Sequence, residues 1–260
     1  MQRDTMLDSQ IADALTQIQC QPDDGNAWHR IGQCLLRTNL PKAARSAIKK
    51  SLQLTLQEKI SAHYEPFFRQ ELLLTIIDNR LELFAKLCHG RTVLHVGCND
   101  YPIFNPATNL HLQLHNLCHC SKLDGFDIDE TGLTELANLV SGTYFSRFSQ
   151  ITENYDLLLV PETIEHVDNI QIFLAELSTI SFKQCLITAP NAFLPNNNGN
   201  YWTESGTYIE HVHPDHTCWF SPATLQTCIR KFTDWQVDEL FLLENRTMVG
   251  CLCSKQGHQQ

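Results

Sequence analysis

The sequence predicts an α/β fold, because short apolar runs typical of buried strands alternate with amphipathic helical patterns over most of the chain. The 260 residues are 43% hydrophobic and 18% charged, a composition typical of a globular protein. A chain of this length can form one domain with a large core, or a core and a small appendage. We therefore expect a largely parallel sheet with helices on both of its faces.

Six runs are expected to be strands, and the last two favour an antiparallel hairpin at an edge of the sheet. The expected strands are residues 92–97, 123–128, 155–160, 184–189, 236–243 and 247–253. Amphipathic helices are expected among them at residues 131–140, 169–180 and 221–232. The last of these has a clear start, with Ser221 as N-cap and Pro222 at the first helical position.

The residues before the first expected strand are predicted to be helical. Residues 65–88 carry a wide apolar stripe at helical spacing, which indicates a long buried helix that stops at Gly90. Further upstream, residues 8–56 resemble the tetratricopeptide pattern, with Gly32 and Ala44 as the small residues that let two helices pack closely. Only about one and a half repeats fit, and an isolated repeat cannot bury its own apolar face. We expect a small all-α tetratricopeptide-like segment over residues 1–60, which either binds a protein partner or packs on the main domain as a helical hairpin.

Composition excludes several classes of protein. The formal net charge of −10 argues against nucleic acid and anionic membranes as partners. No run approaches about 20 apolar residues and the first ten residues are largely polar, so we expect neither a membrane span nor an export signal. The eleven cysteines are scattered, and the pairs Cys118/Cys120 and Cys251/Cys253 lack the spacing of a zinc knuckle. We expect reduced thiols in a cytoplasmic protein.

Three motifs follow expected strands. They read His95-Val96-Gly97-Cys98-Asn99, Asp127-Ile128-Asp129 and Pro161-Glu162-Thr163-Ile164-Glu165-His166-Val167. A glycine at a strand end lets the backbone turn sharply beneath a ligand. An acid after the next strand can accept hydrogen bonds from a ribose diol. The pattern therefore predicts a nucleotide-type cofactor at the carboxyl ends of parallel strands.

In this order, and with these strands before them, the three motifs resemble those of the class I methyltransferases that use S-adenosylmethionine. The resemblance covers residues 90–253 and implies a Rossmann-like seven-stranded methyltransferase sheet. It implies a methyltransferase domain over residues 61–254, a disordered tail over residues 255–260, and S-adenosylmethionine as the cofactor. The cofactor-binding residues that it implies are Gly97, Cys98, Asn99, Asp127, Ile128, Pro161 and Glu162.

Each of these residues has an expected role. Backbone amides just after Gly97 would receive the carboxylate or hydroxyl oxygens of the cofactor. Asp127 would accept both ribose hydroxyls, and Ile128 would lie against the adenine face. The alternative for Asp127 is a surface carboxylate at a strand end. The acid that the family has within the first strand is His95 here, which we expect to be a packed, hydrogen-bonded histidine beneath the site. The second glycine is Asn99, which tolerates positive φ better than most residues.

Three histidines are candidates for a catalytic base: His166, His213 and His216. Methyl transfer from a sulfonium is an in-line displacement, in which a base helps when the acceptor is a hydroxyl. His213 and His216 belong to a His-x-x-His-x-x-x-Phe-Ser-Pro-x-x-Leu stretch that resembles part of some of these methyltransferases, several of them linked to glycan modification. The resemblance implies O-methylation of a small polar or glycan-type acceptor. Alternatively, these histidines hydrogen-bond their own loop. Tyr201 and Trp202 could stack on a sugar or fasten their loop.

The sequence also bears on three other classes of protein. Residues 210–216 match the His-x-His-x-Asp-His pattern of the metallo-β-lactamase fold, but the turn that should follow is absent and the only later histidine is His258. We therefore expect no metal ion. A dinucleotide oxidoreductase is disfavoured, because no Gly-x-Gly-x-x-Gly follows the first strand. The changes at His95 and Asn99 favour one non-enzymatic alternative, a catalytically degenerate methyltransferase-fold scaffold that binds a partner.

Overall fold

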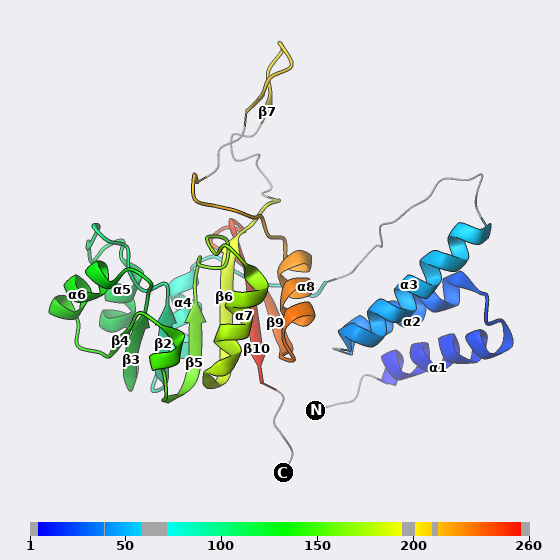
Figure 1. The fold of residues 1–260 in the computed structure, drawn as a ribbon, viewed down its shortest axis with the longest axis horizontal. Coiled ribbons are helices and arrows are strands. Elements are labelled where there is room, and N and C mark those ends of the chain that lie inside the picture. Colours follow the sequence, from blue (N-terminus) through cyan, green and yellow to red (C-terminus); the bar gives the residue numbers. More distant parts are fainter. Residues whose placement is uncertain (1–4, 39, 59–71, 194–200, 210–212, 256–260) are drawn as a thin grey trace. The chain divides into compact units, whose positions relative to one another are not determined.

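The chain forms two compact units, Met1–Glu71 and Leu72–Gln260. The computed structural model describes residues 5–38, 40–58, 72–193, 201–209 and 213–255 (Figure 1). The predicted boundary at residue 60 and residues 256–260 of the predicted tail lie outside the described residues. None of the described helices is both long and apolar enough to cross a membrane.

The first unit consists of three helices in its described part, α1 (Thr5–Cys20), α2 (Gly25–Arg37) and α3 (Pro41–Glu58). Asp24 caps α2 by accepting hydrogen bonds from the amides of Asn26 and Ala27 at 2.8 and 3.0 Å. A methyl group on Gly32 would come within 2.6 Å of Ile48 Cγ1, so the close approach predicted at this glycine is confirmed. The tetratricopeptide resemblance itself stays a sequence-based prediction.

The second unit is built on a mixed sheet with the strand order β1-β9-β10-β6-β5-β2-β3-β4. Only β10 runs antiparallel to its neighbours, β6 and β9. The strands are β1 (Thr75–Ile77), β2 (Thr92–Val96), β3 (Lys122–Phe126), β4 (Tyr144–Phe145), β5 (Asn154–Val160), β6 (Ser181–Pro190), β9 (Gln236–Leu243) and β10 (Met248–Ser254). A separate pair is formed by β7 (Tyr201–Trp202) and β8 (Tyr208–Ile209).

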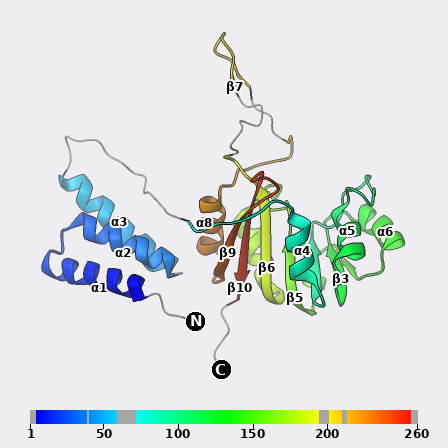
Figure 2. The ribbon, with the colours of Figure 1, turned by 180° about the vertical axis from the view of Figure 1, so that it is seen from behind.

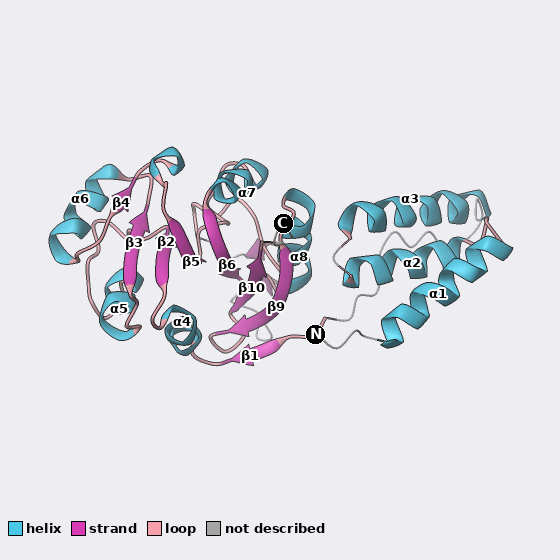
Figure 3. Ribbon diagram, turned by 90° about the horizontal axis from the view of Figure 1, so that it is seen from below, coloured by secondary structure: helices cyan, strands magenta, loops and turns pink. Residues whose placement is uncertain are grey.

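Helices cover both faces of this sheet, as Figures 2 and 3 show from behind and from below. They are α4 (Arg80–Cys88), α5 (Leu110–Leu117), α6 (Glu130–Leu139), α7 (Ile170–Thr179) and α8 (Pro222–Phe232), with a 3₁₀ turn η1 (Phe148–Gln150). On β2, Leu94 and Val96 pack in the core cluster that contains α7 and α8, whereas Val93 packs in the cluster that contains α4 and α5. The α/β fold with helices on both faces is therefore confirmed.

Two predictions about the sheet were wrong. The sheet has eight strands among the described residues rather than seven, because β1 pairs in parallel with β9 and forms the edge. The β9–β10 hairpin exists but is not at the edge, since β10 inserts between β9 and β6. Val249, Cys251 and Cys253 of β10 are fully buried, and such a strand needs hydrogen-bonded neighbours on both sides.

The predicted helix over residues 65–88 is also corrected. Residues 65–71 lie outside the described residues, and residues 75–77 form a strand. The helix α4 begins only after Asn79, whose side chain caps it by accepting a hydrogen bond from Leu81 N at 3.0 Å. The run Thr75-Ile76-Ile77 is β-branched throughout, which favours a strand as soon as an edge is free to pair with it. The predicted stop at Gly90 is confirmed, with a positive φ of 68°.

Asn169 gives a test of how α7 begins. Its exposed side chain accepts a hydrogen bond from Ile172 N at 3.1 Å and so satisfies a free amide in the first turn. We expect Asn169→Ala to lower the free energy of unfolding by about 1 kcal/mol, measured by urea denaturation. Asn169→Ser should restore most of that loss. Equal destabilisation by both substitutions would contradict the capping role.

Candidate functional site

The three motifs come together at the carboxyl edge of the central sheet. Strand β2 pairs in parallel with β3 on one side and β5 on the other. The loops that begin at Gly97, Asp127 and Pro161 therefore leave the sheet next to each other. In open α/β sheets, ligands bind outside the carboxyl ends of such strands. This edge is the candidate site.

Gly97 forms the tight turn that its motif predicts, with a φ of +75°. A Cβ at this position would lie 2.3 Å from Thr163 Oγ1. The Thr163 hydroxyl lies within hydrogen-bonding distance of two backbone carbonyl oxygens, that of Pro161 at 2.9 Å and that of Val96 at 3.2 Å, to which it can donate. The space beside Gly97 on this side is thus filled by Thr163.

The amides that follow Gly97 are already engaged. Gly97 N and Cys98 N both donate to the Phe126 carbonyl, at 2.8 and 3.2 Å, and Asn99 N donates to Asp127 Oδ2 at 3.2 Å. These amides therefore have acceptors within the protein, and the expectation that amides after Gly97 receive cofactor oxygens stays a prediction. The side chain of Cys98 is buried, and burial raises the pKa of its thiol.

Asp127 is half-buried at the end of β3. Its Oδ2 accepts the Asn99 amide and its Oδ1 accepts the Asp129 amide at 3.0 Å. Burial raises the pKa of the carboxyl, an effect that these hydrogen bonds oppose. An ionised carboxylate has about four acceptor positions, so about two remain for a ligand. The neighbouring Ile128 is 83% exposed, an unusual degree of exposure for a large apolar side chain at this edge.

Asn99 keeps the turn in a different way from the one expected. It has no positive φ. Instead its side chain makes two hydrogen bonds, donating through Nδ2 to Asp129 Oδ2 at 3.1 Å and accepting from Tyr101 N at 3.0 Å. The amide side chain also fills the space beside Gly132, where a Cβ would lie 1.8 Å from Nδ2. Asn99 therefore links the loop after β2 to the start of α6.

Glu162 follows the buried Pro161 and is locked by a network that the sequence did not reveal. Its Oε2 pairs with the Arg80 guanidinium and its Oε1 accepts the Thr188 hydroxyl at 3.0 Å. Arg80 N in turn donates to Glu244 Oε1 at 3.1 Å. Arg80 is the first residue of α4. In the sequence, the only indication that a helix begins there is the capping residue Asn79, which lies within an apparently continuous helical stripe.

His95 is buried beneath the site, as predicted, and it pairs with a second buried histidine. Its Nδ1 lies 3.1 Å from His111 Nδ1, and the two rings stack with centroids 5.3 Å apart. His111 Nε2 lies 3.3 Å from the Tyr144 hydroxyl. Burial lowers the pKa of His111 to about 4 and lowers the pKa of His95 well below its usual value. Both rings are neutral at pH 7 as a result.

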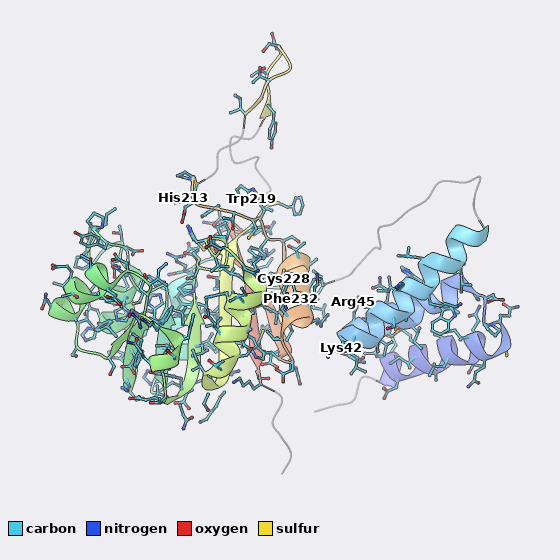
Figure 4. All side chains as sticks on the ribbon, in the orientation of Figure 1. Lys42, Arg45, His213, Trp219, Cys228 and Phe232 are labelled. Atoms are coloured by element: carbon cyan, nitrogen blue, oxygen red, sulfur yellow. The ribbon has the colours of Figure 1, made fainter. Side chains whose placement is uncertain are left out.

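The three candidate bases form one cluster. His166 comes from the turn after β5, and His213 and His216 come from the segment before α8. One ring nitrogen from each lies within 4.8 Å of the others. Ring centroids are 5.4 Å apart for His166–His213, 4.6 Å for His166–His216 and 4.9 Å for His213–His216. Figure 4 shows His213 beyond the carboxyl ends of the strands, with Trp219 nearby.

Backbone and side-chain hydrogen bonds hold the two halves of the cluster together. Thr217 donates twice to the carbonyl of Glu165, through its amide at 2.9 Å and through its hydroxyl at 3.0 Å. His166 Nδ1 donates to Asp215 Oδ2 at 2.8 Å, and Asp215 N donates to His213 Nδ1 at 3.2 Å. His213 and His216 therefore do contribute to their own loop, but they also reach the turn after β5.

Two polar groups near this cluster stay without a partner among the described residues. Glu165 is 1% exposed, and neither of its carboxyl oxygens has a hydrogen-bond partner there. Burial raises the pKa of Glu165 to about 8. The buried Nδ1 of His216 is unpaired in the same sense, and burial, followed by the nearby His166 and His213, lowers the pKa of His216. Buried polar groups normally have partners, so both groups retain unused hydrogen-bonding capacity.

The aromatic pair Tyr201 and Trp202 and the first histidine of the His-x-His-x-Asp-His pattern lie partly or wholly outside the described residues. Tyr201 and Trp202 form β7, but their side chains are not among those described, so stacking on an acceptor stays a prediction. His211 lies outside the described residues.

Comparisons with known proteins give a weak structural similarity. Neither a protein-family model nor a curated protein sequence matches the chain. Among solved structures, it is similar to an S-adenosylmethionine-dependent methyltransferase from Mesorhizobium loti (10% identity, 68% of this chain and 96% of that one, TM-score 0.46). A SAM-dependent methyltransferase from Aquifex aeolicus matches with 15% identity, 67% and 86% coverage and a TM-score of 0.46. The Burkholderia thailandensis 1,6-didemethyltoxoflavin-N1-methyltransferase matches with 14% identity, 68% and 76% coverage and a TM-score of 0.44. At these values the similarities decide neither the activity nor the cofactor of this chain.

The buried histidine pair predicts a pH dependence of stability. A histidine whose pKa is lowered on folding stabilises the fold above its unfolded pKa of about 6.5, and this contribution is lost as the pH falls. We expect the stability difference between the parent and His111→Gln to shrink between pH 6.5 and about 4, by about 1.4 kcal/mol per pH unit. The measurement is urea denaturation at several pH values.

The measurement compares the free energy of unfolding of the parent with that of His111→Gln at each pH. The raised pKa of Glu165 makes stability fall as the pH rises in both proteins, and this effect cancels in the difference. His89→Gln, which replaces an exposed histidine, is the control and should leave the pH profile parallel to that of the parent. A His111→Gln profile that is also parallel to the parent would contradict the proposed neutral pair.

Gly97 and Gly90 form a matched pair for testing the turn. Both have positive φ, +75° and +68°, but only Gly97 has a side chain against it, since nothing lies within 4 Å of a Cβ on Gly90. We expect Gly90→Ala to cost about 1–2 kcal/mol from backbone conformation alone. Gly97→Ala should cost about 1–3 kcal/mol more, because Thr163 must move. Equal losses in thermal or urea denaturation would show that the Thr163 contact is unimportant.

Proposed function

We propose that this protein is an S-adenosylmethionine-dependent methyltransferase, acting on an oxygen of a small polar or glycan-type acceptor. The observation that carries the proposal is the convergence of three loops at the carboxyl edge of the sheet, where Asp127 keeps acceptor capacity beside the Gly97 turn. Such a carboxylate next to a tight backbone turn can bind the ribose of a nucleoside-type cofactor.

In this proposal Asp127 accepts the two ribose hydroxyls with the lone pairs that Asn99 N and Asp129 N leave free. The exposed Ile128 covers one face of the adenine. Gly97, Cys98 and Asn99 contribute the shape of their turn and its carbonyl groups, since their amides are engaged. Pro161 and the Arg80-bound Glu162 form the opposite wall.

The reaction is a displacement at the methyl carbon. The acceptor oxygen forms a bond to that carbon while the carbon–sulfur bond breaks, and its electron pair stays on sulfur to give S-adenosylhomocysteine. The acceptor hydroxyl loses its proton to a base. His166 is the best placed of the three histidines, because Asp215 holds its Nδ1–H at 2.8 Å and so leaves Nε2 as an acceptor. His213 and His216 stand beside it as the other candidates.

A second candidate is a methyltransferase-fold scaffold without catalytic activity. Its support is the set of engaged groups at the site: the amides of Cys98 and Asn99, the Glu162 carboxylate and the Thr163 side chain against Gly97. In that case the N-terminal helices would bind a protein partner. Binding of S-adenosylmethionine separates the two candidates, because only the enzyme requires it.

Titration calorimetry with S-adenosylmethionine and S-adenosylhomocysteine tests the proposal. The parent should bind both, and Asp127→Asn should weaken binding by about 10–100-fold, the value of one or two hydrogen bonds to a charged acceptor. Asp234→Asn is the control, because it removes an exposed carboxylate just before β9, at the opposite edge of the sheet. Circular dichroism checks that both variants fold.

Two outcomes would contradict the proposed methyltransferase activity. One is a parent protein that binds neither ligand, and the other is an Asp127→Asn variant that binds both as tightly as the parent. The first outcome would leave the scaffold as the better account of the fold.

A further inference from the structure

Three imidazoles cluster at the carboxyl edge of the sheet, although a general base requires only one of them. The members of this cluster come from two segments about fifty residues apart in the sequence, yet one ring nitrogen of each lies within 4.8 Å of the others. Only one carboxylate, that of Asp215, is bonded to them among the described contacts, and its side chain is 73% exposed. We propose that His166, His213 and His216 bind a divalent transition-metal ion, with Zn²⁺ as the preferred occupant.

The distances suit such an ion after a small adjustment. Zinc–imidazole bonds of about 2.0–2.1 Å in tetrahedral geometry put two ligand nitrogens about 3.3 Å apart. The observed spread of up to 4.8 Å therefore closes with shifts of about 1 Å in side chains on loops. The backbone around them is already fixed, because Thr217 ties the loop of His213 and His216 to the Glu165 carbonyl.

The hydrogen bonds prepare the histidines as ligands. His166 donates its Nδ1–H to Asp215 at 2.8 Å, which leaves Nε2 unprotonated, the usual carboxylate–histidine arrangement behind a metal. The buried Nδ1 of His216 has no hydrogen-bond partner among the described residues. His213 Nδ1 accepts only a long hydrogen bond of 3.2 Å from Asp215 N, which a metal bond can replace.

The donor set selects the class of ion. Three imidazoles favour zinc and its neighbours in the first transition series over Mg²⁺ and Ca²⁺, which prefer oxygen ligands. Three protein ligands also leave a fourth position for water or a substrate oxygen, as in catalytic rather than structural zinc sites. The sequence led us to expect no metal here, because His-x-His-x-Asp-His lacked later partners. The partner, His166, instead precedes it in the chain.

Metal binding would change how the acceptor is activated. An acceptor hydroxyl in the fourth position would have its pKa lowered by the ion, so its proton could pass to solvent water before the oxygen attacks the methyl carbon. No histidine would then serve as the base. This consequence rests on the proposed function, whereas the metal site itself does not.

Cobalt(II) absorption spectroscopy tests the site without cofactor or acceptor. The full chain, free of any affinity tag, is stripped with a chelator, dialysed and titrated with Co²⁺ alone. We expect one equivalent to bind with visible d–d bands of a low-coordinate site and without a thiolate-to-cobalt band in the near ultraviolet. Zn²⁺ should then displace the cobalt and bleach the spectrum.

Matched variants identify the ligands. The double variant His213→Gln/His216→Gln and the single variant His166→Gln should lose the visible bands. The control His89→Gln/His115→Gln removes two exposed histidines elsewhere and should bind as the parent does. Asp215→Asn should weaken binding by about 10–100-fold through the orientation of His166. Circular dichroism confirms the fold of each variant.

Three results would overturn the site: no cobalt bands in the parent, bands that persist in the His213/His216 double variant, or a near-ultraviolet thiolate band of one equivalent. Calorimetry with S-adenosylmethionine on the same preparations is read independently. Loss of cobalt binding with intact cofactor binding would reject the metal site alone, and the converse would reject the methyltransferase alone.

Discussion

Strand β2 pairs in parallel with both β3 and β5, and this pairing positions every loop of the candidate site that follows a central strand. The registers Val96–Phe126 and His95–Leu159 align the carboxyl ends of the three strands, so that the loops after them leave the sheet side by side. The consequences are direct contacts between those loops: Thr163 lies against Gly97, and the Asn99 amide binds Asp127. Asp127 is thus held in part by the neighbouring loop after β2.

Polar groups at this edge divide into those with satisfied hydrogen-bonding capacity and those without. Glu162 belongs to the first kind, because Arg80 and Thr188 take both of its carboxylate oxygens. Asp127 and His166 belong to the second, since each is oriented by one set of hydrogen bonds and keeps further acceptor capacity. Chemistry with a ligand requires the second kind, and the first kind gives the rigidity that holds it in place.

Much of the second unit could be predicted from its sequence. The strands that became β2, β3, β5, β6, β9 and β10 lie within a few residues of their predicted positions, as do α6, α7 and α8. Strong local signals explain this, such as the Ser221 cap of α8, whose hydroxyl accepts from Thr224 N at 3.2 Å. The helix α5 and the two-residue strand β4 were missed, because eight and two residues give little periodicity. The prediction of a helix before α4 was wrong, because the pattern of a short β-branched run fits a helical stripe and an edge strand equally well.

Local sequence patterns predicted the alternation of strands and helices, the Gly97 turn, the acid after β3 and the burial of His95. The three-dimensional structure was needed to show that β10 lies inside the sheet, that Arg80 forms an ion pair with Glu162, and that His166 lies beside His213 and His216. Local patterns report what a residue prefers within a turn or two of its own chain. Contacts between residues separated by tens of positions depend on the order and direction of strands, which local patterns do not encode.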